Sequence, residues 1–599
     1  MYNCSRFLHK GDFVNNFDLE VLKQIILHKT SNQRELSHVT GYSLGRINKS
    51  ISNLKSNWYL DNQLRLTKKA EELVSSMKPR NAIILAAGYG LRMIPLCRDI
   101  PKALLEVKGA PLIERLIEQL HDADVYDISI VVGYKKEQFE YLIDKYDVQL
   151  IVNTDYHSMN NLNSLSLASK KLKNSYIVPC DIWCEKNPFS KIELYPWYMV
   201  TDRMVSQSRI KSNRSNELIR IADDEKGNRE IGIAFITEDK AEIIKESMIT
   251  LKNSDAYHNA FWEKAALSGK KIILGAKIVP DETVYEINTY DDLIQCDMES
   301  GSLNSEYINI ICESLHAEKH DIYNIESLKA GMTNRSFLFN CAGQKYIFRI
   351  PGEGTDKLIN RREEYDVYQQ IKDRGICDEV IYMNPENGYK ITKFIEGSRN
   401  CDANNEADVR SCMKFLKDFH KLKLTVGHEF DLFSQIEYYE ELRGDQSAYH
   451  DYTTVKNHVF ELKEFIDGLS KEYCLTHIDA VPDNFIITGN DIHLIDWEYA
   501  AMQDPHVDIA MFAIYSLYDK KQTDSLIDIY FEGKCDIETR AKIYAYVAVC
   551  GLLWSNWCEY KRNLGVEFGE YSLRQYRYAK DYYKFAKDLI NQCSDEEVM

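Results

Sequence analysis

The sequence is short of the features that mark membrane, secreted and zinc-binding proteins. No apolar run reaches eighteen residues, about the length that a membrane-spanning helix needs. Residues 1–10 carry no basic segment followed by an apolar one, as a secretory signal would. The 15 cysteines form no CxxC pair and no paired Cys/His spacing, so neither a zinc site nor a disulfide framework is indicated. We expect a cytoplasmic protein with reduced thiols and no membrane contact.

Positive charge is also scarce over most of the chain. The formal net charge is −18 over 599 residues, yet residues 1–80 hold 13 Lys and Arg against 7 Asp and Glu. The rest of the chain is therefore strongly negative and would repel the phosphates of DNA. Any DNA contact is expected at the N-terminus. With 44% apolar residues, the length predicts about three or four domains with ordinary cores.

Residues 17–75 predict helices followed by a small hairpin. Amphipathic segments at residues 19–28, 32–39 and 43–55 predict three helices, with Ser31 capping the second, and residues 58–67 predict the hairpin. The pattern resembles a winged helix-turn-helix domain, whose recognition helix would place Arg46 and Lys49 toward a DNA groove. The resemblance implies possible DNA binding through residues 31–67. The alternative is a small helical module for dimerisation or docking, with the basic residues on a solvated face.

A loop of small residues follows a short apolar strand at residues 82–85. The loop reads LAAGYGLRM, and a PKALL segment follows it. Gly88 and Gly90 permit turn geometry and close approach of backbone N–H groups to phosphate. Arg92 and Lys102 bring positive charge to a triphosphate and to the phosphate that attacks it. Such glycines also serve packing alone in tight strand-to-helix turns, but the two motifs together favour nucleotide chemistry.

These motifs are the nucleotidylyltransferase signature, and residues 80–297 resemble that family throughout. More narrowly, they resemble the bacterial CTP:phosphocholine cytidylyltransferases. The resemblance implies a Rossmann-like α/β domain in which Ala87, Gly88 and Gly90 bind CTP. It also implies catalytic roles for Arg92 and Lys102.

The same resemblance supplies further site residues. Asp181, at the end of an apolar strand, and Asn288 would bind Mg2+. The cytidylyltransferase pattern has Asp at the position of Asn288, so metal binding is expected to be weaker but not lost. Trp262 and Glu263 lie where the family supplies aromatic and acidic contacts to the choline head group. The alternative for Trp262 is a core residue.

Residues 474–499 read CLTHIDAVPDNFIITGNDIHLIDWEY, two short apolar segments around a tight turn. A hairpin here brings Asp479, Asn484 and Asp496 to one end. Phosphoryl transfer needs a base beside the attacking hydroxyl, and an amide with a carboxylate to hold Mg2+ on the triphosphate. Asp479 would be the base, and Asn484 with Asp496 the metal ligands. The alternative is a hairpin whose Asp and Asn residues only cap turns.

This constellation resembles the catalytic core of the choline kinase and aminoglycoside phosphotransferase superfamily, and DWEY at residues 496–499 resembles its choline/ethanolamine branch. The resemblance implies a two-lobed, protein-kinase-like domain that uses ATP. It places Asp508 where relatives stabilise the catalytic loop. The implied nucleotide-binding residues are Asn334 in a phosphate-covering loop, Arg349 on a strand with Glu364 as its helix partner, and Lys393 and Ile395 in the hinge.

Aromatic residues gather near the C-terminus. Trp554 and Trp557 share one helical face, and Tyr571 follows an EFG turn. A quaternary ammonium cannot donate a hydrogen bond, so aromatic rings attract it by their negative faces, on the order of 0.5–2 kcal/mol each. Choline kinases carry WxxW followed by EFG at this place, which implies a choline cage of these residues with negative charge from Glu498. The alternative is an aromatic core stripe.

The sequence thus predicts a winged helix-turn-helix domain at residues 1–78, a nucleotidyltransferase domain at 79–298 and a choline kinase-like phosphotransferase domain at 299–599. The two enzyme resemblances imply successive Mg2+-dependent steps, in which ATP phosphorylates choline and CTP then transfers CMP to phosphocholine with release of pyrophosphate. Two alternatives stay open. One is the same chemistry on ethanolamine or a sugar, and the other is a DNA-binding regulator whose enzyme-like domains sense CTP or choline.

Overall fold

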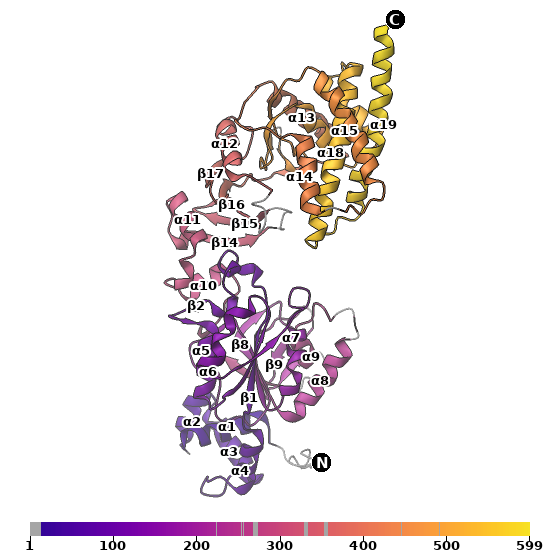
Figure 1. The fold of residues 1–599 in the computed structure, drawn as a ribbon. Coiled ribbons are helices and arrows are strands. Elements are labelled where there is room, and N and C mark those ends of the chain that lie inside the picture. Colours follow the sequence, from indigo (N-terminus) through magenta and orange to yellow (C-terminus); the bar gives the residue numbers. More distant parts are fainter. Residues whose placement is uncertain are drawn as a thin grey trace. The chain divides into compact units, whose positions relative to one another are not determined.

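The computed structural model describes residues 14–598, apart from 31, 223, 253, 255–256, 268–273, 329–333, 353–357, 445 and 490. The chain forms two compact units, Met1–Ser327 and Leu328–Met599 (Figure 1). Among the helices of the described residues, we find none with the length and apolar character that crossing a bilayer requires.

The first unit begins with four helices, α1 (Asn16–His28), α2 (Gln33–Thr40), α3 (Leu44–Ser56) and α4 (Lys68–Met77). Each is capped by a side chain that accepts a hydrogen bond from a first-turn N–H group. The three expected helices are confirmed with slightly shifted ends. Ser31 lies outside the described residues, and Asn32 is the observed cap of α2. At the expected hairpin of residues 58–67, the structure has one antiparallel bridge, from Leu60 to Leu66.

A seven-stranded sheet forms the centre of the first unit. Its order is β12 (Gly275–Val279), β8 (Trp197–Val205), β11 (Gly227–Ile236), β6 (Ser175–Pro179), β1 (Asn81–Ala86), β4 (Asp127–Val132) and β5 (Gln149–Val152). The strands β6, β1, β4 and β5 run parallel, and β11 runs antiparallel to β6 and β8. Every residue of β1, NAIILA, is buried, as expected for an apolar strand covered on both faces.

Helices cover both faces of this sheet (Figure 1). On one side lie α5 (Leu112–Asp122) and α6 (Tyr141–Tyr146), and on the other lie α7 (Asn161–Leu167), α8 (Glu238–Lys252) and α9 (Glu263–Leu267). Because β1 and β6 are parallel, the loops at their carboxyl ends meet at one edge of the sheet, where α/β proteins bind ligands. The remaining elements of this unit are β2 (Glu106–Val107), β3 (Ala110–Pro111), β7 (Ile182–Cys184), β9 (Ile210–Ser212), β10 (Leu218–Arg220), β13 (Val284–Glu286), α10 (Tyr290–Cys296), α11 (Glu306–Leu315) and β14 (Ile322–Ser327).

The N-terminal helices share an apolar core with the sheet. Val21 and Leu22 of α1 and Leu54 of α3 are fully buried and belong to the same cluster as Ile84 of β1. Burying apolar surface against the sheet stabilises helices this short, because short helices are marginal alone. These helices are therefore an integral part of the first unit.

A buried ion pair ties α1 to the sheet. Lys23 Nζ donates to Glu193 Oε2 at 2.8 Å, and the two side chains are 6% and 0% exposed. Glu193 also accepts hydrogen bonds from Trp197 Nε1 at 3.0 Å and from the Tyr176 hydroxyl at 2.8 Å. Both oxygens of the buried carboxylate are thus satisfied, which burial of a charge requires.

The second unit has a sheet lobe followed by a helical lobe. In the sheet, β15 (Asn334–Cys341), β16 (Gln344–Pro351), β18 (Lys390–Lys393) and β17 (Val380–Met383) pair in that order, all antiparallel. The helix α12 (Arg361–Ile371) lies between β16 and β17 in the chain, and its N-cap Asn360 accepts from the N–H groups of Arg362 and Glu363. The two-lobed expectation is confirmed.

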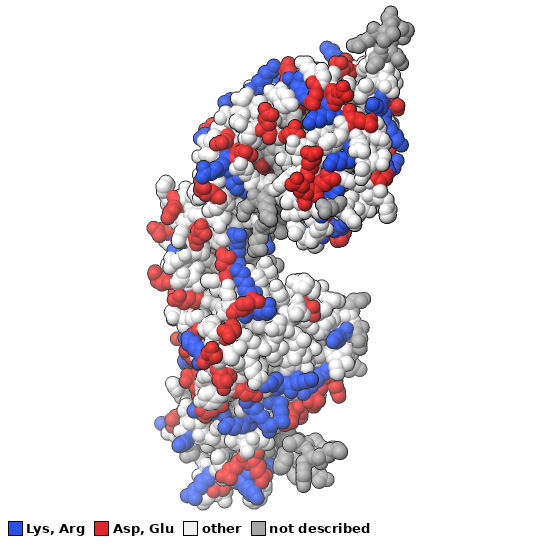
Figure 2. Space-filling model, in the orientation of Figure 1, with Lys and Arg blue, Asp and Glu red and all other residues white. Residues whose placement is uncertain are grey.

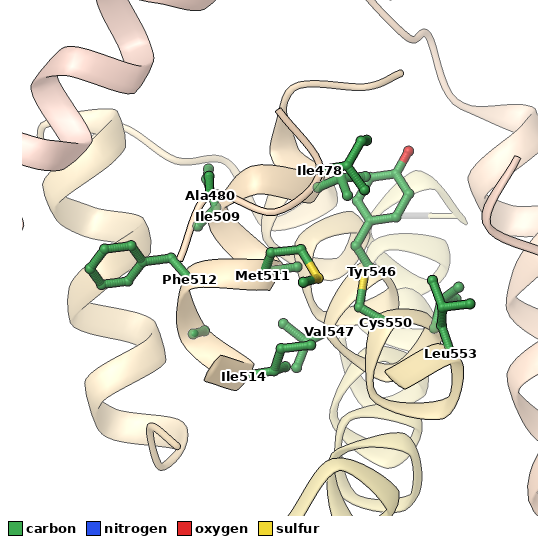
Figure 3. Packing of buried hydrophobic residues seen from close by; sticks show 14 of the residues in the cluster. Ile478, Ala480, Ile509, Met511, Phe512, Ile514, Tyr546, Val547, Cys550 and Leu553 are labelled. Atoms are coloured by element: carbon green, nitrogen blue, oxygen red, sulfur yellow. The ribbon is translucent and has the colours of Figure 1, made fainter. Parts of the chain in front are cut away.

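The helical lobe is built around α18 (Ile537–Asn563). It packs against α14 (Leu432–Arg443), α15 (Tyr452–Gly468), α16 (His506–Tyr515) and α19 (Glu570–Val598). Figure 3 shows part of this core, in which Ile478 and Ala480 lie with residues of α16 and α18. These two residues flank Asp479, so the core fixes the loop that carries it. The other elements are α13 (Glu406–His420), α17 (Lys520–Phe531), β19 (Arg399–Asn400), β20 (Cys474–Thr476), β21 (Phe485–Thr488), β22 (Asp491–Leu494) and β23 (Ala501–Gln503).

The buried pair of the first unit makes a testable prediction. Glu193→Gln removes the carboxylate that pairs directly with the buried Lys23 and leaves only the charge of Glu20 nearby, and breaking such a buried pair costs about 3–5 kcal/mol. We expect the backbone amides of α1 to exchange hydrogen much faster in this variant of the full-length chain. The exposed pair of Lys191 and Asp124, at 3.0 Å, provides the control, because Asp124→Asn should change exchange little. Equal exchange of α1 in the two variants would show that the Lys23–Glu193 pair does not hold the helix.

Candidate active sites

A cavity of about 460 Å³ opens at the carboxyl ends of β1 and β6. It brings together all seven of the nucleotide, catalytic and metal residues expected for the first unit: Ala87, Gly88, Gly90, Arg92, Lys102, Asp181 and Asn288. Gly90 has φ of 64°, the left-handed conformation that favours glycine. A Cβ on Gly133 would lie 2.7 Å from the Ala87 carbonyl oxygen, so a second glycine lets the Ala87 backbone pack this closely.

Lys102 is the centre of the polar network in this cavity. Its Nζ donates to Asp181 Oδ2 at 2.6 Å and to Asn288 Oδ1 at 2.7 Å. Arg92 Nη2 also donates to Asn288 Oδ1, at 3.0 Å. Two cationic groups and two oxygen ligands thus converge, although more than 70 residues separate Lys102 from Asp181. The site can hold phosphate through Lys102 and Arg92 and a hard cation through the oxygens.

An acidic cluster lies behind Asp181. Burial, with the Asp181 charge, raises the pKa of Glu286 above its usual range. Burial also raises the pKa of Glu263 to about 8, and the carboxylates of Glu230, Glu286 and Asp181 add to the effect. Oε2 of Glu263 has no hydrogen-bond partner among the described residues. The cluster is short of positive charge and is therefore suited to a cationic group.

Trp262 lies beside this cluster rather than on the cavity wall. Its side chain is fully buried, and its ring centroid is 5.9 Å from that of Tyr198. The adjacent residue, Phe261, is 57% exposed and lines the cavity instead. The sequence analysis missed Phe261 together with Tyr89, Tyr156 and Met159, which also line the cavity. They lie in loops, where no periodic pattern indicates which side chains face a site.

The second unit carries Asp479 and Asn484 on a loop between β20 and β21. Asn484 Nδ2 donates to the Asp479 backbone oxygen at 2.9 Å and to its Oδ2 at 3.2 Å. The N–H of Ile495 donates to the Asn484 backbone oxygen at 3.0 Å, which draws the neighbouring Asp496 toward the same place. Burial raises the pKa of Asp479 well above its usual range, and the charges of Asp496 and Glu498 add to this. The expected hairpin of β21 and β22 is confirmed, although its turn residue Asn490 lies outside the described residues.

Asp508 fixes the backbone before Asp479. Its two oxygens accept the N–H groups of His477 and Ile478 at 3.1 and 2.8 Å, and His420 Nε2 lies 3.0 Å from Oδ2. Burial lowers the pKa of His477 to about 4, so its ring is neutral and Nε2 donates to the Ile495 carbonyl at 3.0 Å. The loop that carries Asp479 is thus held from both sides.

Arg349 and Glu364 pair as expected. Arg349 Nη1 and Nη2 lie 2.5 and 2.9 Å from the two Glu364 oxygens, and both residues are buried. Burial alone would raise the pKa of Glu364, but the opposite charge of Arg349 outweighs burial, and the pKa falls to about 2. Lys393 and Ile395 lie together in the hinge and line a cavity of about 650 Å³ with α12 and β17. Residues 329–333 of the expected phosphate-covering loop lie outside the described residues.

Glu498 lies in the ion network around Arg349. Its Oε2 accepts from Asn334 Nδ2 at 2.9 Å and lies 3.3 Å from Arg361 Nη1. Asn334, which we expected to bind nucleotide, thus contacts Glu498. Glu498, which we expected near choline, contacts Arg361. The sequence analysis missed Arg361, because a basic residue at the start of a helix usually faces solvent.

Trp554 and Trp557 lie in a cluster of aromatic rings. Their centroids are 5.4 Å apart, Tyr499 meets Trp554 edge-on at 5.7 Å, and Phe568 lies 5.2 Å from Trp557. Burial raises the pKa of Tyr571, with a contribution from the Asp479 charge, so this residue lies near the acid. Trp554 Nε1 also donates a hydrogen bond to Met511 Sδ at 2.9 Å. Tyr499 and Phe568 were missed, although Tyr499 directly follows Glu498 in the sequence.

Both metal sets combine carboxylate and amide oxygens. Among residues that the structure describes, no group of three or more His, Cys, Asp and Glu side chains is arranged to hold a metal ion. Asp181 with Asn288, and Asp496 with Asn484, each offer hard oxygen donors, and Mg2+ in nucleotide sites is commonly held by one or two protein ligands and the phosphates. The residues present therefore fit Mg2+.

Comparison with known proteins supports both enzyme assignments. A family model described as a MobA-like NTP transferase domain matches residues 82–186, and one described as the phosphotransferase enzyme family matches residues 324–546. A choline-phosphate cytidylyltransferase of Streptococcus pneumoniae is 33% identical over 215 residues, 35% of this chain and 94% of that protein. Protein LicA of Haemophilus influenzae is 26% identical over 257 residues, 41% of this chain and 96% of that protein.

A solved structure is also similar. The crystal structure of choline kinase LicA from Streptococcus pneumoniae has 30% sequence identity and a TM-score of 0.41, and the match covers 47% of this chain and 99% of that one. The identity and coverage of the cytidylyltransferase match establish a family for the nucleotidyltransferase part. The chain belongs to the choline-phosphate cytidylyltransferase family and also carries a choline kinase-like phosphotransferase domain.

Proposed function

We propose that this chain makes CDP-choline in two steps, phosphorylating choline with ATP and then transferring CMP from CTP to the phosphocholine. The observation that carries the proposal is the presence of two complete sets of acid, amide and cationic groups on one chain. One set is centred on Lys102 and the other on Asp479. Relatives named for the two successive activities match the chain.

In the kinase step, Asp479 accepts the proton of the choline hydroxyl as its oxygen attacks the γ-phosphorus of ATP. The bond to the bridging oxygen breaks, and ADP leaves. Arg349, held by Glu364, would bring positive charge to the α- and β-phosphates. Asn484 and Asp496 would hold Mg2+, which neutralises charge on the phosphates. Lys393 and Ile395 offer the hinge backbone to adenine.

Aromatic rings supply the recognition of choline. Trp554, Trp557 and Tyr571 lie in one cluster with Tyr499. The Trp557 ring already has a cation nearby, because Lys561 Nζ lies 5.6 Å from its centroid. A trimethylammonium group would gain on the order of 0.5–2 kcal/mol from each such face. Asp479 provides the nearby negative charge.

In the cytidylyl step, a phosphate oxygen of phosphocholine attacks the α-phosphorus of CTP, and pyrophosphate leaves. Lys102 and Arg92 stabilise the charge that develops on the phosphates. The backbone of Ala87, Gly88 and Gly90 would lie along the triphosphate, and Asp181 with Asn288 would hold Mg2+. Glu263 belongs to the acidic cluster and Trp262 lies beside it, and the choline head group would be the cation that this cluster lacks.

Incubation of the purified chain with choline, ATP, CTP and Mg2+ tests the proposal. We expect ADP, pyrophosphate and CDP-choline, identified by mass spectrometry. Ethanolamine and sugars are run in parallel, and we expect kcat/KM for choline to exceed that for ethanolamine, since a primary ammonium loses more hydration than the rings return. Preferred turnover of ethanolamine or a sugar would assign the same chemistry to that substrate, and no turnover of any would reject the proposal.

Two substitutions separate the steps. Asp479→Asn removes the proton acceptor and should lower choline phosphorylation about 10²–10⁴-fold, while the variant still converts added phosphocholine to CDP-choline. Lys102→Ala should lower pyrophosphate release about 10²–10³-fold and leave phosphorylation unchanged. The exposed neighbour Asp483 provides a control, since Asp483→Asn should keep both activities. Kinase turnover retained by Asp479→Asn would show that another group accepts the proton.

DNA binding is a second proposed function, favoured by the surroundings of α3. Asn48 and Lys49 of α3 are exposed, and Arg46 Nη2 donates to the Arg214 backbone oxygen at 2.9 Å. Arg214 lies in the hairpin of β9 and β10, which also exposes Lys211 and Arg220. Figure 2 shows Lys and Arg gathered on one face of the first unit. The hairpin would hold a phosphate backbone beside α3. Arg46 stacks on Phe17 at 3.3 Å and therefore has a structural role, joining α3 to its neighbours.

Fluorescence anisotropy with a labelled random DNA duplex tests this second function. We expect affinity that falls steeply with salt, because phosphate contacts release counterions, and weaker binding by Lys49→Glu and Arg214→Glu. Cytidylyltransferase activity should be unchanged in both variants, which shows that the unit is folded. If the chain does not bind DNA at low salt, or if both variants bind DNA as tightly as the unsubstituted chain, the N-terminal helices have a structural role only.

A further inference from the structure

Arg361, the first residue of α12, connects the two lobes of the second unit. Its Nη1 lies 3.0 Å from Glu364 Oε2 and 3.3 Å from Glu498 Oε2. Glu364 belongs to α12 in the sheet lobe, whereas Glu498 follows β22 in the helical lobe. The side chains of Arg361, Glu364 and Glu498 are 6%, 0% and 3% exposed. Because these side chains are buried, their ion pairs are screened little by solvent.

Arg349 and Arg361 share a limited set of carboxylates. Arg349 Nη1 lies 2.5 Å from Glu364, but Asp496 and Glu498 are also near, at 3.7 and 3.9 Å. Without Arg361, these three carboxylates would be left with the Arg349 guanidinium and the more distant charge of the buried Lys390, which acts on Glu364 and Asp496. Arg361 lies closer to Glu498 than Arg349 does, at 3.3 against 3.9 Å, and it also pairs with one oxygen of Glu364. Arg349 can then keep its bidentate contact with Glu364 and its aim toward the nucleotide.

Gly388 shows that the fold makes room for this arrangement. A Cβ on Gly388 would lie 2.6 Å from Arg361 Cδ, and the φ of Gly388 is 70°. The carbonyl oxygen of the same residue accepts from Arg349 Nη2 at 3.1 Å. Gly388 thus leaves room for Arg361 and, through its carbonyl oxygen, orients Arg349. The next residue, Arg362, is different: its side chain is 71% exposed and pairs with Glu386 at 2.6 Å on the surface.

We propose that Arg361 is a positioning residue of the phosphotransferase site, which holds Glu498 away from Arg349 and joins α12 to the Asp496–Glu498 segment. The inference rests on the kinase step of the proposed function. Arg361 acts through Arg349 and Asp496 and does not touch the substrates. Its loss would let Glu498 pair with Arg349, so that the guanidinium turns from the ATP phosphates and Asp496 shifts with its neighbour.

The test compares Arg361→Gln with the matched surface variant Arg362→Gln. We expect Arg361→Gln to lower kcat/KM for ATP at least tenfold, since small misplacement of positioning groups costs up to about 10²-fold. It should also weaken ADP binding, measured by calorimetry without any acceptor, while KM for choline changes less. Arg361→Lys keeps the charge but not the two-pronged geometry and should be intermediate. Arg362→Gln should behave as wild type.

A double-variant cycle separates positioning from general support. In Arg361→Gln/Glu498→Gln, the charge of Glu498 that would draw Arg349 is removed, so ADP affinity should recover relative to Arg361→Gln alone. A purely structural Arg361 would show no such recovery. Wild-type ADP affinity in Arg361→Gln, or equal loss in both Glu498 backgrounds, would overturn the inference. Because ADP binding needs no phosphoryl acceptor, failure of the inference is distinguishable from failure of the choline assignment.

Discussion

The fold brings several carboxylates together in buried regions, and the repulsion between them must be balanced by cations. Asp479, Asp496 and Glu498 share one region of the second unit, and Asp181, Glu263 and Glu286 share one of the first. Buried carboxylates of like sign raise each other's pKa unless cations balance them. The chain supplies Lys102 in the first unit and Arg349 with Arg361 in the second. On the proposed function, Lys102 and Arg349 also bind the nucleotide phosphates, whereas Arg361 only balances the charge of the buried carboxylates.

The two units hold their acids in place by different means. In the first, Asp181 follows a buried parallel strand whose register with β1 is fixed along its length, so the sheet fixes the position of the acid to which Lys102 donates. In the second, the acids lie on loops, and Asp508 holds two backbone N–H groups beside Asp479. By accepting two backbone N–H groups, the Asp508 carboxylate fixes this loop as the hydrogen bonds between paired strands fix a sheet. Both solutions place charge on a rigid support, which preorganised catalysis requires.

Short-range motifs made much of each site predictable. The glycine loop with Lys102 and the HxD segment with Asn484 and Asp496 are compact patterns, and the structure brings their members together. Contacts across the chain were not predictable, since Arg361 and Glu498 are 137 residues apart. A helix-initial arginine looks like a surface residue until the opposite lobe is present. The helices of the N-terminus were visible from periodicity, but their burial against the sheet through Lys23 was not.

The placement of Glu498 bears on how the second unit would distinguish amines. A primary ammonium is recognised through hydrogen bonds to carboxylates, whereas a trimethylated one can only meet charge and ring faces. Glu498 Oε2 accepts from Asn334 and Arg361, so this oxygen is directed to the sheet lobe. Burial, with the Asp479 charge, raises the pKa of Tyr499 and Tyr571, so these two rings lie near that acid, and Trp554 meets Tyr499 edge-on. On the proposed function, the ion network that orders the ATP side therefore also removes a hydrogen-bond acceptor from the amine side, which favours methylated nitrogen over unmethylated nitrogen.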